Sequence, residues 1–326
     1  MRHVKLKVLL SAFVWCFICY AGTTDLPWHE MSSIMQVSLL WMLGIRLVGW
    51  MAVPPAELQQ VGFLSYVGSF LWFAVPVHAN KSARRPFGQI VVKALQLSLI
   101  VLLKMMLIPI LQSWLLRCVS SAGGGQVLAQ WDHYREAVIY TSLFFVLAVC
   151  GTFSMDVMEA LVPLISSDRF RFLGFNDTVF FATSVRDFWS RRYNRLVSTL
   201  LHDSVFVPLR RHANWPPIAA AFGAFLVSGI LHMHVAHIGF RSGVLSALCF
   251  FILQAAASSV STIPSAPALP APLAWLFTQL FLMATSPLYL GLFVFASPDY
   301  LLKNPPSVPG PIHDLAAGVV PSFCPA

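Results

Sequence analysis

Two short stretches decide how this chain is organised: Thr183-Ser-Val-Arg-Asp-Phe-Trp-Ser-Arg-Arg-Tyr-Asn194 and Phe225-Leu-Val-Ser-Gly-Ile-Leu-His232. The first is rich in arginine and aromatic residues, and the second is an apolar run that ends on a histidine. Both lie between Asn176 and His237, while most of the remaining chain is continuous apolar sequence. Ionisable groups embedded in apolar runs usually mark functional sites, so we expect any chemistry in this region.

The composition indicates a membrane protein. Of the 326 residues, 57% are hydrophobic and 10% are charged, whereas soluble domains carry roughly 25% charged residues. These charged side chains are too few to cover a water-facing surface, and the apolar runs are continuous rather than alternating as in a β-barrel. The sequence therefore predicts an all-α polytopic membrane protein with a single transmembrane domain over residues 1–326.

About eight membrane-spanning helices are predicted from the apolar runs. The expected spans are 8–21, 34–53, 61–77, 90–116, 137–160, 217–240, 244–263 and 273–296. Residues 8–21 could instead be the apolar core of a signal peptide. A basic, amphipathic segment precedes the sixth span, and the proline-rich tail 297–326 is expected to be an extended cap or disordered.

Three cations lie within the predicted spans, and one of them, Lys93, is close enough to the end of its span to extend to the headgroups. Lys104 lies near the middle of its span and should face the interior of the helix bundle. Arg46 can either face the interior or extend to the lipid headgroups, and both interpretations stay open. The basic loops 81–85 and 169–211 favour the cytoplasmic side. Alternation then puts the basic amino terminus on the opposite side, so the sequence leaves the orientation undecided.

The net charge of +8 fits basic loops that face anionic headgroups. Nucleic acid is not expected as a partner, because the basic residues lie close to membrane segments. The six cysteines are scattered along the chain and are predicted to be thiols, rather than members of a disulfide framework or a zinc site. They are Cys16, Cys19, Cys118, Cys150, Cys249 and Cys324.

The arginine-rich stretch is amphipathic if residues 186–201 form one helix with steps of about 100°. One face would then be apolar, with Trp189, Tyr193, Leu196, Val197 and Leu200. Arg191 and Arg195 would lie opposite, as in a helix at a membrane surface. Asn194 would lie on the rim, where its amide could hold a histidine or donate to an oxygen on which charge develops.

The sixth span places His232 on one face with Phe225, Ser228, Gly229 and Ala236. Three of these neighbours are small and could admit a helix or a ligand chain beside the imidazole. The alternative is a neutral histidine bonded to another helix. His234 and His237 should point about 200° and 140° away from His232, so the three are not expected to share one metal ion.

These residues resemble the membrane-bound O-acyltransferase superfamily, in particular its wax synthase-like branch. That branch typically shows Ser-Leu-Arg-Asp-Phe-Trp-Gly-Arg-Arg-Trp-Asn, followed by Phe-x-x-Ser-Gly-x-x-His. In this chain Ser190 replaces the glycine, Tyr193 replaces the second tryptophan, and Met233 stands where many plant members have glutamate. The resemblance is specific over residues 176–237; elsewhere it rests on length and the multi-helix plan.

The resemblance implies transfer of an acyl group from acyl-coenzyme A to the hydroxyl of a lipid-soluble alcohol. It implies His232 as general base with support from Asn194, and it implies no metal or other cofactor. It also implies a set of substrate-binding residues: Arg186, Asp187, Trp189, Arg191, Arg192, Tyr193, Arg195 and Ser228. Arg210 and Arg211 could join Arg191, Arg192 and Arg195 in holding the coenzyme phosphates by charge-assisted bonds.

Several alternatives stay open at this point. The expected partners are acyl-coenzyme A, a lipid alcohol and membrane lipids, in the endoplasmic reticulum if the source is eukaryotic. The acceptor could be a fatty alcohol, a diacylglycerol, a sterol or a terpenoid, and the acyl length and oligomeric state are not determined by the sequence. A non-enzymatic lipid-binding or transport protein is the rival interpretation.

Overall fold

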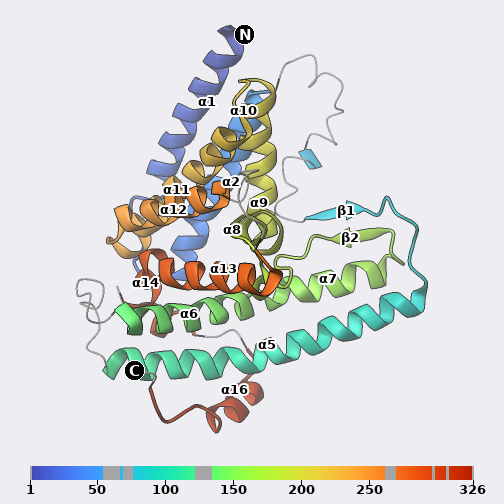
Figure 1. Cartoon of the computed structure of the whole chain (residues 1–326), viewed down its shortest axis with the longest axis vertical. Coiled ribbons are helices and arrows are strands. Elements are labelled where there is room, and N and C mark those ends of the chain that lie inside the picture. Colours follow the sequence, from blue (N-terminus) through green and yellow to red (C-terminus); the bar gives the residue numbers. More distant parts are fainter. Residues whose placement is uncertain are drawn as a thin grey trace. The chain divides into compact units, whose positions relative to one another are not determined.

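A computed structural model describes residues 2–53, 67–68, 76–121, 134–260, 269–295, 298–305 and 308–324 (Figure 1). These residues are mostly helical, as the predicted class requires. The chain divides into two compact units. The first consists of residues 1–75 and 178–279, and the second of residues 76–177 and 280–326.

Four helical segments among the described residues are long and apolar enough to cross a membrane. They are α2 (Met31–Met51), the Phe87–Val119 part of α5 (Phe87–Ser121), the continuous stretch of α6 (Tyr134–Gly151) and α7 (Phe153–Ile165), and α11 (Pro217–Phe240). They coincide with the predicted spans 34–53, 90–116, 137–160 and 217–240. The chain is therefore an integral membrane protein by the length and composition of its helices.

The other predicted spans correspond to shorter or bent elements. The apolar part of α1 (Arg2–Ala21) covers Leu6–Ala21, and α12 (Val244–Val260) is similarly short. Helices α13 (Ala271–Thr285) and α14 (Pro287–Val294) meet at a bend of 52°, and they make a fifth span if the pair crosses as one. Most of the predicted span 61–77 lies outside the described residues.

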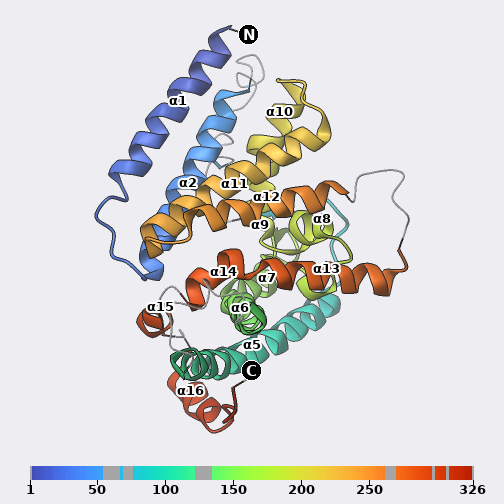
Figure 2. The same ribbon diagram turned by 60° about the vertical axis from the view of Figure 1, so that its left-hand side comes forward.

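In the first unit, α12 runs beside α11, and α2 packs against both α1 and α11 (Figures 1 and 2). A missing side chain allows the α1–α2 contact, because a Cβ atom at Gly44 would lie 1.8 Å from Nε1 of Trp15. The Trp15 ring packs edge-on against Trp41 with centroids 4.5 Å apart. These contacts fix the helices around the histidine-bearing α11.

Arg46 of α2 faces protein partners. Its Nη1 donates to Oγ of Ser204 at 3.4 Å, and its guanidinium lies 6.0 Å from the ring centroid of Trp50. Of the two interpretations left open by the sequence, the interior one is therefore supported. The partner Ser204 lies in the polar segment that carries the candidate site.

In the second unit, α5 packs against α6 and α7. Nζ of Lys104 lies 2.5 Å from a carboxylate oxygen of Asp156, and the two side chains are 13% and 8% exposed. The prediction that Lys104 faces the interior is confirmed. A short two-stranded sheet, β1 (Val77–Ala79) and β2 (Phe170–Phe172), was not predicted; its strands pair antiparallel with Val77 opposite Phe172.

Two predictions about the carboxyl-terminal part are wrong. Cys118 and Cys324 form a disulfide, so these two cysteines are not thiols. The described part of the tail forms two short helices, α15 (Pro298–Lys303) and α16 (Gly310–Ala317), where an extended cap or disorder was predicted. Both helices begin at or beside a proline, which fits the first turn because an N–H is not needed there. Helix α16 docks against α5 and thereby brings the distant cysteines together.

Candidate functional site

The polar segment is not one helix, so the prediction of a continuous helix over 186–201 is wrong. It is built from pieces, with breaks between them. In order they are α8 (Val185–Asp187), the π-helical turn η4 (Phe188–Arg192), α9 (Arg195–Leu201), a second π-helical turn η5 (His202–Phe206) and α10 (Val207–Arg211). Such wide turns inside helices are frequent at functional sites.

Asn194 sits at the main break in a left-handed conformation, with φ 44° and ψ 57°. Asparagine adopts this region more readily than most residues with a side chain. Its Oδ1 accepts the backbone N–H of Val197 at 3.2 Å, which caps the amino end of α9. An amide oxygen only accepts, so any bond that this side chain donates must come from its NH₂ group.

His232 lies in α11 with its ring half-buried. Nδ1 is 2.6 Å from the backbone oxygen of Ser228, one turn earlier in the helix. Because a carbonyl oxygen only accepts, Nδ1 must carry the proton, and the neutral ring then has its acceptor lone pair at Nε2. The ring also stacks on Phe251 with centroids 4.2 Å apart. The imidazole is therefore held in one tautomer and one orientation.

An aromatic cluster connects the polar segment to His232. Trp189 donates its indole N–H to Oε1 of Gln254, at 3.0 Å. Its ring lies 5.9 Å from that of Phe251 and 6.3 Å from that of Phe225. Phe251 thus contacts both Trp189 and His232, and it couples the position of the π-helical turn to that of the histidine.

The residues on α12 were missed in the sequence. Gln254 is completely buried, and Phe251 is 3% exposed. A lone amide within an apolar span was the available signal, because a polar side chain there must find a partner. Phe251 gave no signal, since one more phenylalanine in an apolar run looks like ordinary packing.

Gly229 lets α12 approach close to the histidine. A Cβ atom at this position would lie 3.0 Å from Cδ1 of Leu248 and 3.2 Å from Cβ of Phe251. The small residues of α11 were predicted to admit either a neighbouring helix or a ligand chain. At Gly229 the structure shows a neighbouring helix. A larger residue would displace the ring on which His232 stacks.

Tyr193 stacks on Phe188, with ring centroids 5.2 Å apart and an angle of 14° between planes. The edge of Trp189 completes the group at 5.5 Å. Burial raises the pKa of Tyr193 to about 12, so its phenol stays protonated at neutral pH. The replacement of tryptophan by tyrosine at this position keeps an amphipathic ring in place.

The arginines of the polar segment differ in whether their side chains already bind other residues of the protein. Arg192 binds Asp187 at 2.5 Å and also donates to the hydroxyl of Thr178 at 2.7 Å, so it holds the turn together. Arg186 and Arg191 are exposed, and Arg195 begins α9. Within the described part of the chain, the side chains of Arg191 and Arg195 have no polar partner, which leaves their donors for a ligand.

The remaining basic residues lie at the end of the segment. Arg210 is exposed and donates from Nη1 to the backbone oxygen of Trp215 at 2.5 Å. Arg211 is exposed as the last residue of α10. The arginines expected to hold an anion are therefore spread from α8 to α10. They differ in how exposed they are and in which bonds hold their side chains.

His234 and His237 have surroundings different from those of His232. His234 bonds to Trp41 at 2.8 Å and to Thr23 at 3.1 Å, whereas His237 is exposed. Over the described ranges, no three histidine, cysteine, aspartate or glutamate side chains gather as ligands for one metal ion.

Comparison with known proteins identifies the same part of the chain. Residues 175–253 match the pattern of the "Membrane bound O-acyl transferase family". This range contains Asn194 and His232, and also Trp189, Phe225 and Phe251 of the aromatic cluster. The resemblance predicted from the sequence is thereby confirmed.

Three relatives show how far the similarity extends. "Probable long-chain-alcohol O-fatty-acyltransferase 6" of Arabidopsis thaliana is 30% identical over 118 residues, which cover 33% of this chain and 33% of the relative. "Long-chain-alcohol O-fatty-acyltransferase" of Simmondsia chinensis is 30% identical over 106 residues, covering 31% and 29%. "Acyl-CoA--sterol O-acyltransferase 1" of Arabidopsis thaliana is 43% identical over 58 residues, covering 16% and 17%. The chain thus spans about a third or less of the length of each of these relatives.

Proposed function

We propose that this chain, whose residues 175–253 match the membrane-bound O-acyltransferase family, transfers an acyl group from acyl-coenzyme A to the hydroxyl of a lipid-soluble alcohol. The observation that carries the proposal is the bond from His232 to the Ser228 carbonyl. This bond supports a neutral imidazole with its acceptor at Nε2, which is the form that a general base requires.

The reaction we propose is direct transfer without an acyl-enzyme. Nε2 of His232 accepts the proton of the alcohol as the alcohol oxygen attacks the thioester carbonyl. The tetrahedral intermediate then expels the coenzyme as a thiolate, which takes the proton back from the imidazolium. The products are the ester and free coenzyme A thiol. The NH₂ group of Asn194 would donate to the oxyanion or position the alcohol.

We infer roles for the other residues of the proposed site from their charge and burial. Arg191 and Arg195 would bind the coenzyme phosphates, helped by the exposed side chains of Arg186 and Arg211, because their donors lack partners among the described residues. Asp187 and Arg192 would position the turn, since they bind each other. Trp189, Tyr193 and Ser228 would contact the apolar groups of the substrates and hold His232 in position. Acyl-coenzyme A is the co-substrate, and the proposal includes no other cofactor.

The names of the relatives suggest which acceptors to test first. Two of those proteins are named for long-chain alcohols, and one is named for sterols. A long-chain alcohol is therefore our first acceptor and a sterol the second. The proposal also includes eight spans, and location in the endoplasmic reticulum if the source is eukaryotic.

The test is acyl transfer by the purified full chain in lipid nanodiscs. Palmitoyl-coenzyme A and hexadecanol are supplied, free thiol is followed by a colorimetric reagent, and the wax ester is identified by mass spectrometry. We expect both products from the wild type and from His237→Ala, which alters an exposed histidine of the same helix. His232→Ala should form neither. A chain that only binds or transports lipid would consume no thioester, and turnover by His232→Ala would refute the general-base role.

A further inference from the structure

The second unit contains a cavity that the proposed reaction does not use. Its volume is about 200 Å³, and it lies between the first turns of α5, the last turns of α7 and strand β2. The wall includes three cations and one carboxylate: Arg85, Lys93, Arg171 and Glu159. Apolar side chains, among them Ile90 and Phe172, complete it. None of these residues belongs to the 175–253 match.

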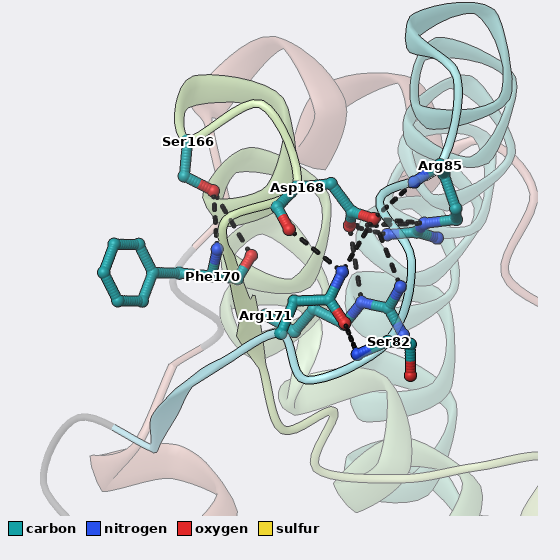
Figure 3. A network of polar contacts seen from close by, with 7 residues as sticks. Ser82, Arg85, Ser166, Asp168, Phe170 and Arg171 are labelled. Carbon is teal, nitrogen blue, oxygen red and sulfur yellow. Dashed lines mark hydrogen bonds and ion pairs between the residues drawn. The ribbon is translucent and has the colours of Figure 1, made fainter.

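Two of the cations are held in place by one buried carboxylate. The side chain of Asp168 is 0% exposed, and Nη2 of Arg85 and of Arg171 lie 2.7 Å and 3.1 Å from its oxygens. Figure 3 shows the contacts of the Asp168 carboxylate with both arginines. Arg85 also donates its backbone N–H at 2.9 Å. These bonds, chiefly the one from the Arg85 side chain, keep the pKa of Asp168 far below its usual range, so the carboxylate stays charged.

The network leaves donors on the cavity-lining arginines. In each guanidinium, Nε and Nη2 bond to Asp168. Nη1 of each carries two more N–H groups, and the described residues provide no partner for either. Arginines that are already oriented bind an anion with a smaller loss of side-chain entropy. Two Nη1 groups, one from Arg85 and one from Arg171, therefore lie in fixed orientations at the cavity wall.

The charge balance of the cavity favours an anion with a single charge. Three cations, Arg85, Lys93 and Arg171, face two carboxylates, Glu159 and Asp168, which leaves one positive charge in excess. Gly174 leaves room for one of these carboxylates, because a Cβ atom there would lie 2.1 Å from Oε2 of Glu159. A phosphodiester carries one negative charge and would neutralise the site.

The cavity lies near the ends of two membrane spans. Lys93 is six residues after the start of α5, and Glu159 is six residues before the end of α7. Six residues correspond to about 9 Å of helix. This level suits the headgroup layer, which is roughly 5–8 Å thick on each side of the hydrocarbon core. Exposed Lys93 also places one cation where a lipid phosphate can reach it.

We propose that this cavity binds the phosphate of a phospholipid headgroup, with Arg85, Arg171 and Lys93 as the donors and the apolar wall beside the start of the acyl chains. The site is separate from the proposed acyl-transfer site in the first unit. Its occupation can be measured without donor or acceptor, so failure of either proposal leaves the other intact.

The test is native mass spectrometry of the full chain released from detergent containing phosphatidylglycerol. The wild type should retain the phospholipid, and diacylglycerol, which lacks a phosphate, should not be retained. Lys93→Glu should reduce retention at least tenfold, and so should Ala94→Trp, which fills the cavity without changing charge. The matched control is Arg84→Glu, an exposed change next to Arg85 that does not line the cavity.

Three results would overturn the proposal. The first is equal retention by Lys93→Glu, Ala94→Trp and Arg84→Glu, with unchanged melting temperatures. The second is equal retention of diacylglycerol by the wild type. The third is displacement of the phospholipid by micromolar coenzyme A or inorganic phosphate, which would show that the cavity takes a soluble phosphate and not a headgroup.

Discussion

Trp41 donates its indole N–H to Nδ1 of His234 across 2.8 Å, and this bond fixes the tautomer of that histidine. Because Nδ1 accepts, the neutral ring carries its proton on Nε2, which lies 3.1 Å from Oγ1 of Thr23. The Thr23 hydroxyl in turn donates to the backbone oxygen of Cys19 at 2.6 Å. His232, two residues earlier, has the opposite tautomer. One histidine therefore joins helices, and the other presents a lone pair at Nε2.

His234→Ala is accordingly expected to lower stability and to leave catalysis intact in the folded protein. It would remove the acceptor of a half-buried indole N–H, which costs roughly 1–3 kcal/mol when the donor finds no water. The measurement is a thermal melt of the purified chain beside the turnover per folded molecule, with His237→Ala as control. Loss of turnover with an unchanged melt would assign His234 to the chemistry instead.

Three substitutions at Asn194 separate its two roles. Asn194→Ala should lose about 1 kcal/mol with the cap of α9, in addition to any effect on turnover. Asn194→Asp keeps the capping oxygen but lacks the NH₂ donor, and Asn194→Gly keeps the left-handed backbone at little cost. Both should melt near the wild-type temperature yet lose about 100-fold or more in turnover, as when an oxyanion donor is removed. Wild-type turnover by Asn194→Gly would restrict this residue to capping.

The arginines should differ in what their removal affects. Arg191→Gln and Arg195→Gln should each raise the KM for acyl-coenzyme A roughly tenfold, since a hydrogen bond to a charged group contributes about 1–3 kcal/mol. The effect should shrink at high salt, and the KM for the alcohol should not change. Arg192→Gln should instead lower the melting temperature, because Arg192 holds Asp187 and Thr178. If the KM for acyl-coenzyme A is unchanged in Arg191→Gln and Arg195→Gln, these residues of the segment do not bind the coenzyme.

Asp168→Asn should destabilise the second unit by roughly 3 kcal/mol, because Arg85 and Arg171 would lose their shared partner. The folded pKa of Asp168 lies far below the unfolded value of about 3.9. Its stabilisation is therefore complete above about pH 5 and is lost only as the pH falls further, through the folded pKa.

The measurement for Asp168 is the difference in melting temperature between wild type and Asp168→Asn across pH. It should be constant from pH 5 to 8 and should shrink at lower pH, where the wild type also loses the charge. Asp314→Asn, at an exposed position of α16, is the matched control. A difference that grows toward pH 3 would contradict the assigned charge state.

Hydropathy predicted the spans that are long and apolar, and the cost of a buried charge predicted that Lys104 faces inward. The same reasoning could not place its partner Asp156. A periodic pattern also failed over 186–201, because the π-helical turn is held by bonds from Arg192 to Thr178 and from Trp189 to Gln254, which lie 14 and 65 residues away in the sequence. The three-residue strands β1 and β2 are too short to give a pattern.

The sulfur–sulfur bond between Cys118 and Cys324 lies near one end of α5, and it indicates which side of the membrane that end faces. Such bonds persist in oxidising compartments and are rare where glutathione keeps thiols reduced. Phe87 and Cys118 are about 46 Å apart along the helix, more than the roughly 30 Å of the hydrocarbon core. We therefore expect Arg85 on the cytosolic side, as its charge favours, and the linked cysteines on the lumenal or extracellular side. A membrane-impermeant thiol reagent added from the cytosol would then not reach the pair, even after its reduction.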